Sequence, residues 1–316
     1  MEVKIPSVNY TGKIREVTIG TGNKAVTIGG QTCFNFHTFE CPISHPPLIS
    51  YEVMDSAPEE WPDVCKKPFQ SVLNDPVRWA KKCVEEYSAK LLTISLTSID
   101  PIGMNRSASD IAKIVENLIK EVDVPLLFWG CDNPEKDTET LKLIAEVCDG
   151  KNVGIGPVID KNYKQLGAAG IAYKQVILAS SPVDVNLAKQ LNILLLELGV
   201  PENKIIMDPT TGGLGYGIEY TYSVMERDRI AGLIQQDDKL AFPMICYVGR
   251  ETWKTKEAGL SSDEFPGMGK QEERGILMEA LTAVLLASAG ADILVMRHPK
   301  AVQLMDGIIE EIMEGK

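Results

Sequence analysis

The chain has 316 residues, a length that fits either two ordinary domains or one large α/β barrel. Its 44% hydrophobic and 24% charged residues are ordinary for a globular protein with a substantial core. The 44 acidic residues outnumber the 32 basic ones, and the net charge of −12 argues against nucleic acid or an anionic membrane as a partner. Since no apolar run approaches the roughly 18 residues of a membrane span, and the start MEVKIPSVNY lacks a signal-peptide pattern, we expect a cytoplasmic protein.

Residues 1–47 form a hairpin and a connection in this interpretation. Two short strands are expected at 14–19 and 25–31, joined across the glycine-containing turn at 20–24. The letters GTGNKA in this turn resemble a phosphate-binding glycine pattern. A strand-like segment follows them where the pattern requires a helix, so we do not expect a dinucleotide site.

From residue 48 onward, short β-branched runs alternate with stretches in which apolar residues recur every three or four positions. Asp75-Pro76 predicts the start of one helix, and His298-Pro299 opens the last one. The predicted strands are 48–54, 91–97, 125–130, 153–158, 175–180, 204–208, 241–248 and 293–297. Eight strand–helix pairs predict a (β/α)8 TIM barrel over residues 48–316, with the hairpin capping its bottom, one domain overall. An open doubly wound sheet is the alternative.

The seven cysteines are scattered, and no two are spaced CxxC, so we expect reduced thiols and no cluster held by this chain alone. His37, Cys41 and His45 are spaced four apart, which on a helix would align them as metal ligands. Because prolines interrupt this segment, we expect a polar connection there and no metal site.

Side chains at the ends of barrel strands form the functional mouth of such a fold. The loop DPTTGGLGYG at 208–217 has glycines and threonines that allow close backbone approach to a ligand, although a plain flexible loop has the same composition. The candidate ligand-binding residues of the mouth are Asp100, Asp208, Thr210, Thr211, Gly212, Gly213, Tyr247, Arg250 and His298.

Several of these candidates have an alternative structural interpretation. Asp100 and Asp208 precede prolines and are also good loop openers. Arg250 and Arg297 either bind a carboxylate or phosphate group of a ligand or pair with Asp55, Asp100 or Asp208. His298 either faces the mouth or caps the last helix.

Five segments together resemble a known family: GNKAVTIGGQT, DPVRWAKKCVEEYSAKLLTISLTSIDP, IGPV, MDPTTGGLGYGIEYTYSVMERDRIAGL and ILVMRHP. They are similar to the small subunit of the bacterial corrinoid iron–sulfur protein and to its archaeal relative, the delta subunit of acetyl-CoA decarbonylase/synthase. The similarity runs through nearly the whole chain and is most specific at 207–233.

This resemblance implies a TIM barrel paired with a large subunit that carries a [4Fe–4S] cluster and a corrinoid-binding domain. The corrinoid (cobalamin) would lie between that domain and the barrel mouth. The heterodimer would carry a methyl group from a methyltetrahydrofolate methyltransferase to acetyl-CoA synthase in the reductive acetyl-CoA pathway. The chain has neither a DxHxxG cobalt-binding motif nor a cluster motif, so the partner would hold both metal centres and this chain would not be catalytic alone.

Two alternatives stay open. A pterin-dependent methyltransferase acting on methyltetrahydrofolate uses the same barrel, and Asp55, Asp100 and Asp208 would then hydrogen-bond the pterin. A purely structural subunit would organise the large partner without touching the cofactor.

Overall fold

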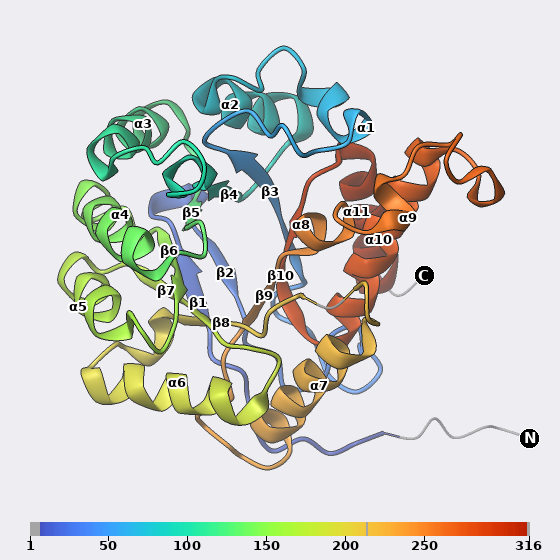
Figure 1. Ribbon diagram of the computed structural model, residues 1–316. Helices are drawn as coiled ribbons and strands as arrows, with labels where there is room; N and C mark the ends of the chain where they lie inside the picture. Colours follow the sequence, from blue (N-terminus) through green and yellow to red (C-terminus); the bar gives the residue numbers. More distant parts are fainter. Residues whose placement is uncertain (1–6, 213, 315–316) are drawn as a thin grey trace, which may run out of the picture.

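The computed structural model describes residues 7–212 and 214–314. Within this part of the chain, eight parallel strands close into a barrel in which each strand neighbours the next along the chain (Figure 1). They are β3 (Leu48–Met54), β4 (Leu92–Ser95), β5 (Leu126–Trp129), β6 (Gly154–Val158), β7 (Val176–Ser180), β8 (Ile205–Asp208), β9 (Met244–Cys246) and β10 (Ala291–Met296). Pairing of β10 with β3 completes the ring, so the predicted TIM barrel is confirmed and the open sheet is excluded.

Helices surround the barrel in an outer ring (Figure 1). The long ones are α2 (Pro76–Tyr87), α3 (Ala108–Glu121), α4 (Pro134–Val147), α5 (Tyr163–Tyr173), α6 (Val185–Leu198), α7 (Glu219–Leu233), α10 (Gln271–Ala289) and α11 (Pro299–Glu314). Three short helices join them: α1 (Asp63–Lys66), α8 (Val248–Thr252) and α9 (Lys256–Gly259). In the described chain no helix combines the length and the apolar character that crossing a bilayer requires.

Sequence signals placed helix starts correctly. The Asp75 carboxylate accepts hydrogen bonds from the backbone N–H groups of Val77 (3.1 Å) and Arg78 (3.0 Å), which leaves Pro76 as the first residue of α2. This cap satisfies donors that a helix start leaves unpaired, and proline fits there because it has no N–H to satisfy. The predicted start of the last helix at Pro299 is likewise confirmed.

The barrel interior and the layer beneath the helices are separate buried clusters, because alternate residues of a strand face opposite sides. Leu127, Leu178 and Ile245 belong to the interior cluster, whereas Phe128 and Ile177 pack outward against helix residues. The glycines of β6 leave room for neighbouring side chains in the barrel interior. A side chain at Gly156 would place its Cβ 2.6 Å from Leu178 Cβ.

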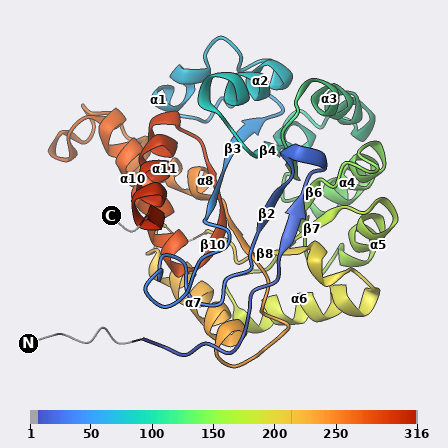
Figure 2. The same ribbon diagram turned by 180° about the vertical axis from the view of Figure 1, so that it is seen from behind.

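The predicted hairpin consists of β1 (Val17–Ile19) and β2 (Val26–Ile28), antiparallel with Val17 opposite Ile28. Its apolar residues pack into the interior cluster of the barrel. Asn152, just before β6, donates from its side-chain amide to the carbonyls of Thr18 (2.8 Å) and Gly20 (3.0 Å). Figure 2 shows the hairpin across the end of the barrel where the strands begin, so it closes the bottom.

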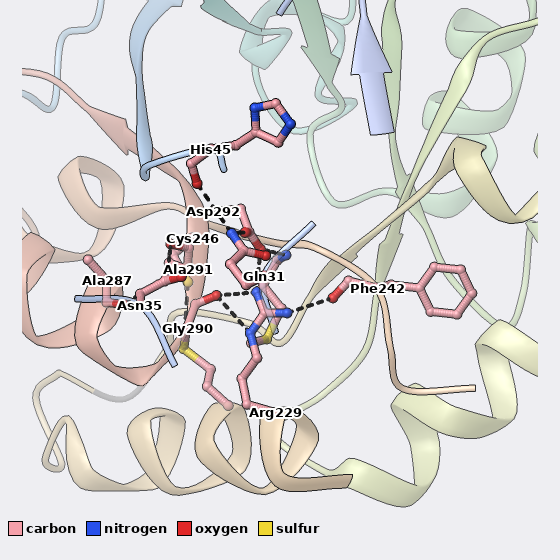
Figure 3. A network of polar contacts seen from close by, with 12 residues as sticks. Gln31, Asn35, His45, Arg229, Phe242, Cys246, Ala287, Gly290, Ala291 and Asp292 are labelled. Atoms are coloured by element: carbon pink, nitrogen blue, oxygen red, sulfur yellow. Dashed lines mark hydrogen bonds and ion pairs between the residues drawn. The ribbon is translucent and has the colours of Figure 1, made fainter. Parts of the chain in front are cut away.

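A buried polar network ties the connection after the hairpin to the barrel (Figure 3). The Asp292 carboxylate pairs with Arg229 of α7 and accepts hydrogen bonds from Gln31 Nε2 (2.6 Å) and Met244 N (2.7 Å). Arg229 also donates to the Gly290 and Phe242 carbonyls. The network joins the N-terminal segment, α7, β9 and β10 into one packed unit.

One expectation about the cysteines is wrong. Cys33 and Cys41 form a disulfide within the N-terminal connection, whereas all seven thiols were expected to be reduced. Spacing could not predict this pair, because the turns of 34–40 bring the two residues together. Five cysteines of the described chain, Cys131 among them, are free thiols.

Candidate functional site

A cavity of about 200 Å³ opens at the mouth of the barrel, where the strands end. Six of the predicted residues line it together: Asp208, Thr210, Thr211, Gly212, Tyr247 and Arg250. They come from the loops after β8 and β9, which are neighbours in the ring. The barrel therefore brings together residues up to 42 positions apart in the sequence.

The loop after β8 begins with a fixed turn. The Asp208 carboxylate accepts hydrogen bonds from Ser180 Oγ (2.7 Å) and from the backbone N–H of Thr210 (3.1 Å). Thr210 has a φ of 61°, a left-handed backbone that a β-branched residue rarely adopts. Its hydroxyl donates to the Ser181 carbonyl (2.5 Å), and its carbonyl accepts from the Thr221 hydroxyl (3.2 Å), so both sides of the turn are held.

The Asp208 carboxyl group is buried, and burial disfavours its charged form. Burial raises its pKa to about 7, although hydrogen bonds from Ser180 and Thr210 and the positive charge of Arg250 act in the opposite direction. The side chain is 3% exposed. Near neutral pH the mouth thus holds a carboxyl that can either donate or accept a hydrogen bond.

Two aromatic residues form part of the cavity wall. The rings of Trp129 and Tyr247 lie 4.2 Å apart between centroids, at an interplanar angle of 47°. The indole Nε1 of Trp129 and the hydroxyl of Tyr247 are buried, and neither has a hydrogen-bond partner among the described residues. Burial also raises the pKa of Tyr247, so its hydroxyl stays protonated. Both groups are donors without an acceptor in the described part of the chain.

Arg250 of α8 lies at the rim of the cavity. It forms an ion pair with Asp132, in the loop after β5, and a second contact with Glu251 at 3.4 Å. Burial disfavours its charge, but Asp132 together with Glu52 and Glu251 raises its pKa above the ordinary value. Arg250 therefore pairs with acids, but not with the aspartates that were predicted as its partners. The pair with Asp132 bridges opposite sides of the cavity entrance.

A charged pair of the barrel interior involves the ends of β3 and β10. Glu52 pairs with Arg297 and accepts a hydrogen bond from Ser95 Oγ at 2.6 Å. Burial opposes ionisation of Glu52, yet Arg297 holds its pKa below the ordinary value. The Arg297 guanidinium also lies 4.3 Å from the ring centroid of Trp61. Arg297 is thus used within the protein, but Glu52 takes the place of the aspartates that were predicted as its partners.

Some candidates lie elsewhere. Asp100 shapes its own loop by accepting a hydrogen bond from the N–H of Ile102 at 2.9 Å, and it is not among the described residues that line the cavity. His298 is 3% exposed and accepts from the N–H of Lys300 (3.2 Å), so it caps the last helix, as its alternative predicted. Gly213 lies outside the described residues.

Four lining residues are absent from the candidate set: Trp129, Asp132, Ser180 and Glu251. Trp129 had a usable signal, because it is two residues after the inward-facing Leu127 on the same strand. Asp132 had none, since its φ of 66° turns it toward Arg250 in a way that composition does not reveal.

Comparison with known proteins agrees with the fold. Dihydropteroate synthase of Xanthomonas albilineans superposes with a TM-score of 0.56 and 14% sequence identity, over 94% of this chain and 97% of that one. A second structure of this synthase, with 4-aminobenzoic acid, gives a TM-score of 0.57 at the same identity, over 93% and 96%. At this identity the likeness concerns the barrel alone.

Sequence comparison is more specific. The chain is 35% identical to the acetyl-CoA decarbonylase/synthase complex subunit delta of Archaeoglobus fulgidus, over 96% of this chain and 69% of the relative. The corresponding subunits of Methanocaldococcus jannaschii and Methanothermobacter thermautotrophicus are also 35% identical, over 96% and 98% of this chain and 75% and 78% of theirs. Residues 16–309 match the family model described as CO dehydrogenase/acetyl-CoA synthase delta subunit. The predicted resemblance is confirmed, and the chain belongs to this delta-subunit family.

Proposed function

We propose that the chain is the small subunit of a cytoplasmic heterodimeric corrinoid iron–sulfur protein, and that its barrel mouth covers a corrinoid carried by the large subunit. The complex carries a methyl group from a methyltetrahydrofolate methyltransferase to acetyl-CoA synthase. Membership of the delta-subunit family supports this assignment. The observation that carries the covering role is the mouth cavity, which six of the candidate residues line together.

The cavity is too small to enclose a corrinoid and suits a subunit that lies over one face of it. The cavity of about 200 Å³ is smaller than pockets that enclose small ligands, which are usually about 300–1,000 Å³. A tetrapyrrole ring is larger than this space, so this chain could lie over one face of the ring but not enclose it. Most of the ring would then have to be held by the partner.

The residues of the mouth suit the edge of a corrin, which carries carboxamide side chains. Amides need both donors and acceptors, and the wall offers the guanidinium donors of Arg250 beside the carboxyl of Asp208. Trp129, Tyr247, Thr211, Asp208 and Arg250 would hold the group. When bound, a corrinoid supplies the cobalt that takes up and releases the methyl group.

The chain's own contribution would be protection and positioning. Trp129 and Tyr247 exclude water from the floor of the mouth by their packing, and the pinned turn at Thr210 keeps the loop after β8 in place. The Asp132–Arg250 pair joins two rim loops across the entrance. None of these groups has to change covalently during methyl transfer.

The pterin-dependent alternative is less well supported. It requires Asp55, Asp100 and Asp208 to face one ligand. Asp55 instead accepts hydrogen bonds from the N–H and hydroxyl of Ser98, and Asp100 organises its own turn. Of the three, Asp208 lines the cavity. The structural likeness to dihydropteroate synthases concerns the fold and adds nothing to this alternative.

The test is to fill the cavity in the assembled complex. Gly212 lines the cavity, and Gly267 has open space around its Cβ position in the loop between α9 and α10. Complexes carrying Gly212→Phe or, as a matched control, Gly267→Phe are purified anaerobically with the large subunit. Cobalt and iron per complex, the corrinoid absorption spectrum and the rate of oxidation of reduced cobalt are then measured.

We expect Gly212→Phe to lose corrinoid or to oxidise at least several-fold faster, while Gly267→Phe behaves as the unaltered complex. We also expect the isolated chain to be colourless. Equal corrinoid content and equal oxidation rates in both variants would contradict the covering role and favour a purely structural subunit. Binding of methyltetrahydrofolate by the isolated chain in calorimetry would favour the methyltransferase.

A further inference from the structure

The disulfide between Cys33 and Cys41 joins a buried segment of the N-terminal connection to a segment at the surface. Gln31, Cys33 and Asn35 are each 2% exposed or less. Phe39 is 57% exposed, and Cys41 is partly exposed. The two sulfur atoms therefore belong to parts of the chain with different surroundings.

Hydrogen bonds to the barrel hold the buried side of the disulfide. The side-chain amide of Asn35 donates to the carbonyls of Ala287 (3.1 Å) and Ala291 (2.9 Å), as Figure 3 shows. Gln31 donates to the Asp292 carboxylate in the buried network. None of these contacts uses a sulfur atom, so this side stays in place whether the cysteines are oxidised or reduced.

The surface side, residues 36–41, has backbone hydrogen bonds inside its own loop. The amides of Glu40 and Cys41 both donate to the His37 carbonyl, at 2.9 and 3.4 Å. The cysteines are 8 positions apart, and a cross-link of this kind removes conformational freedom from the loop that it closes. We therefore expect the order of residues 36–41 to depend on the disulfide.

Glu40 in this loop holds the N-terminal segment. Its side chain is 4% exposed and accepts hydrogen bonds from the Val8 N–H (2.8 Å) and the Tyr10 hydroxyl (2.7 Å). Nδ1 of His37 lies 3.0 Å from the same carboxylate. We call the contacts of Glu40 with Val8 and Tyr10 the N-terminal clasp. Because Glu40 is adjacent to Cys41, movement of the loop would take the carboxylate away from both donors.

We propose that Cys33 and Cys41 form a reversible redox switch that controls the N-terminal clasp. The inference rests on the proposed cytoplasmic location but not on what the mouth binds. Disulfides are rare in a reducing cytoplasm, and those found there are usually transient, catalytic or redox-sensing. The oxidised pair closes the clasp, and the reduced pair releases residues 8–10 and 36–41.

The chemical step is thiol–disulfide exchange with a dithiol. One thiolate of the dithiol attacks the sulfur of the partly exposed Cys41, and the sulfur of Cys33 leaves. The second thiol then breaks the mixed disulfide and closes a disulfide in the reductant. Two electrons and two protons pass from the dithiol to the two cysteines, and an oxidant of the disulfide class reverses the step.

The chain beyond the clasp stays attached to the barrel when the clasp opens. The amides of Thr11 and Gly12 donate to the Leu233 carbonyl, at 3.1 and 2.8 Å. The Ile14 side chain is fully buried, and its amide donates to the Gln31 carbonyl at 2.9 Å. The switch therefore changes two neighbouring surface segments and leaves the barrel as it is.

Hydrogen exchange of the whole chain, followed by mass spectrometry of peptides, tests the switch. The oxidised protein is compared with protein that has been treated with dithiothreitol in the absence of denaturant. We expect exchange in peptides covering 7–10 and 36–41 to rise at least about tenfold on reduction, while peptides of β5 and β6 change less than about twofold. Oxidised glutathione should restore the slow exchange.

Variants separate the disulfide from the clasp. The double variant Cys33→Ser, Cys41→Ser should exchange rapidly at both segments in either condition. Its matched control, Cys131→Ser, removes a free thiol and should behave as the unaltered chain. Glu40→Ala should speed exchange at 7–10 in the oxidised protein as well, whereas Glu59→Ala, at an exposed position, should not.

Equal exchange of both segments in the oxidised and reduced protein would overturn the switch. A disulfide that survives millimolar dithiothreitol in the folded protein would overturn it too, as would cysteines that oxidised glutathione leaves unpaired. The corrinoid content of the complex tests the function proposed for the mouth separately, so the two proposals can fail independently.

Discussion

The bottom and the mouth of the barrel use buried polar groups in different ways. At the bottom, both oxygens of the Asp292 carboxylate accept hydrogen bonds, and Arg229 donates to two backbone carbonyls as well. Gln31 Oε1 is the atom of that network without a partner among the described residues. At the mouth, Trp129 Nε1 and Tyr247 Oη have no described partner, and burial raises the pKa of Asp208 to about 7.

The difference shows that polar contacts stabilise the fold at the bottom, whereas two polar groups at the mouth stay unpaired in the described chain. A network in which nearly every polar group is paired fixes one arrangement of the chain, whereas buried donors without an acceptor lower stability unless a ligand or a partner supplies one. The same contrast holds for apolar groups. The hairpin buries Val17 and Ile28 at the bottom, while the rim exposes Ile102 and Tyr216. We infer that the bottom serves stability and the mouth serves recognition.

The largest expected effect comes from breaking the bottom network. Arg229→Ala leaves the Asp292 carboxylate buried without its cation, and loss of one partner of a buried pair costs about 3–5 kcal/mol. Urea denaturation measures this change in the free energy of unfolding. The matched control is Lys113→Ala, which removes an exposed ion pair with Asp110 and should cost less than about 1 kcal/mol. Equal losses in the two variants would refute the assignment of the bottom as the stability region.

Because the Asp208 carboxyl of the mouth is buried, the free energy of unfolding should depend on pH. The folded pKa of Asp208, about 7, lies above an unfolded value of about 3.9, so the folded state binds more protons between pH 4 and 7. Stability from this group is therefore complete below pH 4 and falls as pH rises to 7. Asp208→Asn removes the buried charge and should exceed the unaltered chain in stability at pH 8 by up to about 4 kcal/mol, at about 1.4 kcal/mol per pKa unit.

This pH prediction has its own control. Asp160→Asn removes one negative charge from an exposed position and so corrects for the change in net charge. Unfolding free energies of the three proteins are compared at pH 4, 6 and 8. If Asp208→Asn is no more stable than the unaltered chain at pH 8, the buried carboxyl does not have the raised pKa.

Packing at the mouth is tight despite its unused donors. A Cβ at Gly249, in α8, would lie 2.7 Å from Arg297 Cγ and 2.9 Å from Glu279 Oε1. Gly249→Ala should therefore cost about 1–3 kcal/mol by overpacking. Gly307→Ala, on the exposed side of α11 with open space around it, should instead stabilise by about 0.5–1 kcal/mol, because alanine favours helix. Calorimetric melting of both variants gives opposite signs if the packing is as described.

Much of the fold could be predicted from the sequence because periodicity is a local signal. The eight strands, the Asp75 cap and the hairpin all follow from residues that are neighbours in the chain. The mouth was predicted in part for the same reason, since Asp208, Thr210 and Thr211 occupy one loop at the end of a strand. The barrel rule then placed Tyr247 and Arg250 beside them.

The predictions that failed depend on the folded geometry of the side chains and turns, which sequence patterns do not give. The choice between a ligand contact and a turn anchor for Asp100 rests on which N–H groups its carboxylate meets, and sequence does not give this. The partners of Arg250 and Arg297 are Asp132 and Glu52, which lie 118 and 245 residues away. Pairing of Cys33 with Cys41 likewise depends on the folded turn between them.

Another small expected effect concerns the hairpin that closes the bottom. Asn152 has a φ of 55°, so Asn152→Gly keeps its backbone while removing both side-chain hydrogen bonds to Thr18 and Gly20. We expect a global loss of about 1 kcal/mol. Hydrogen exchange should rise mainly at the Gly20 amide, which donates to the Asn152 carbonyl at 2.8 Å, because the hairpin would open before the barrel does. Equal acceleration at amides of β5 and β6 would mean that the hairpin and the barrel unfold as one unit, and the bottom would then be a single cooperative structure.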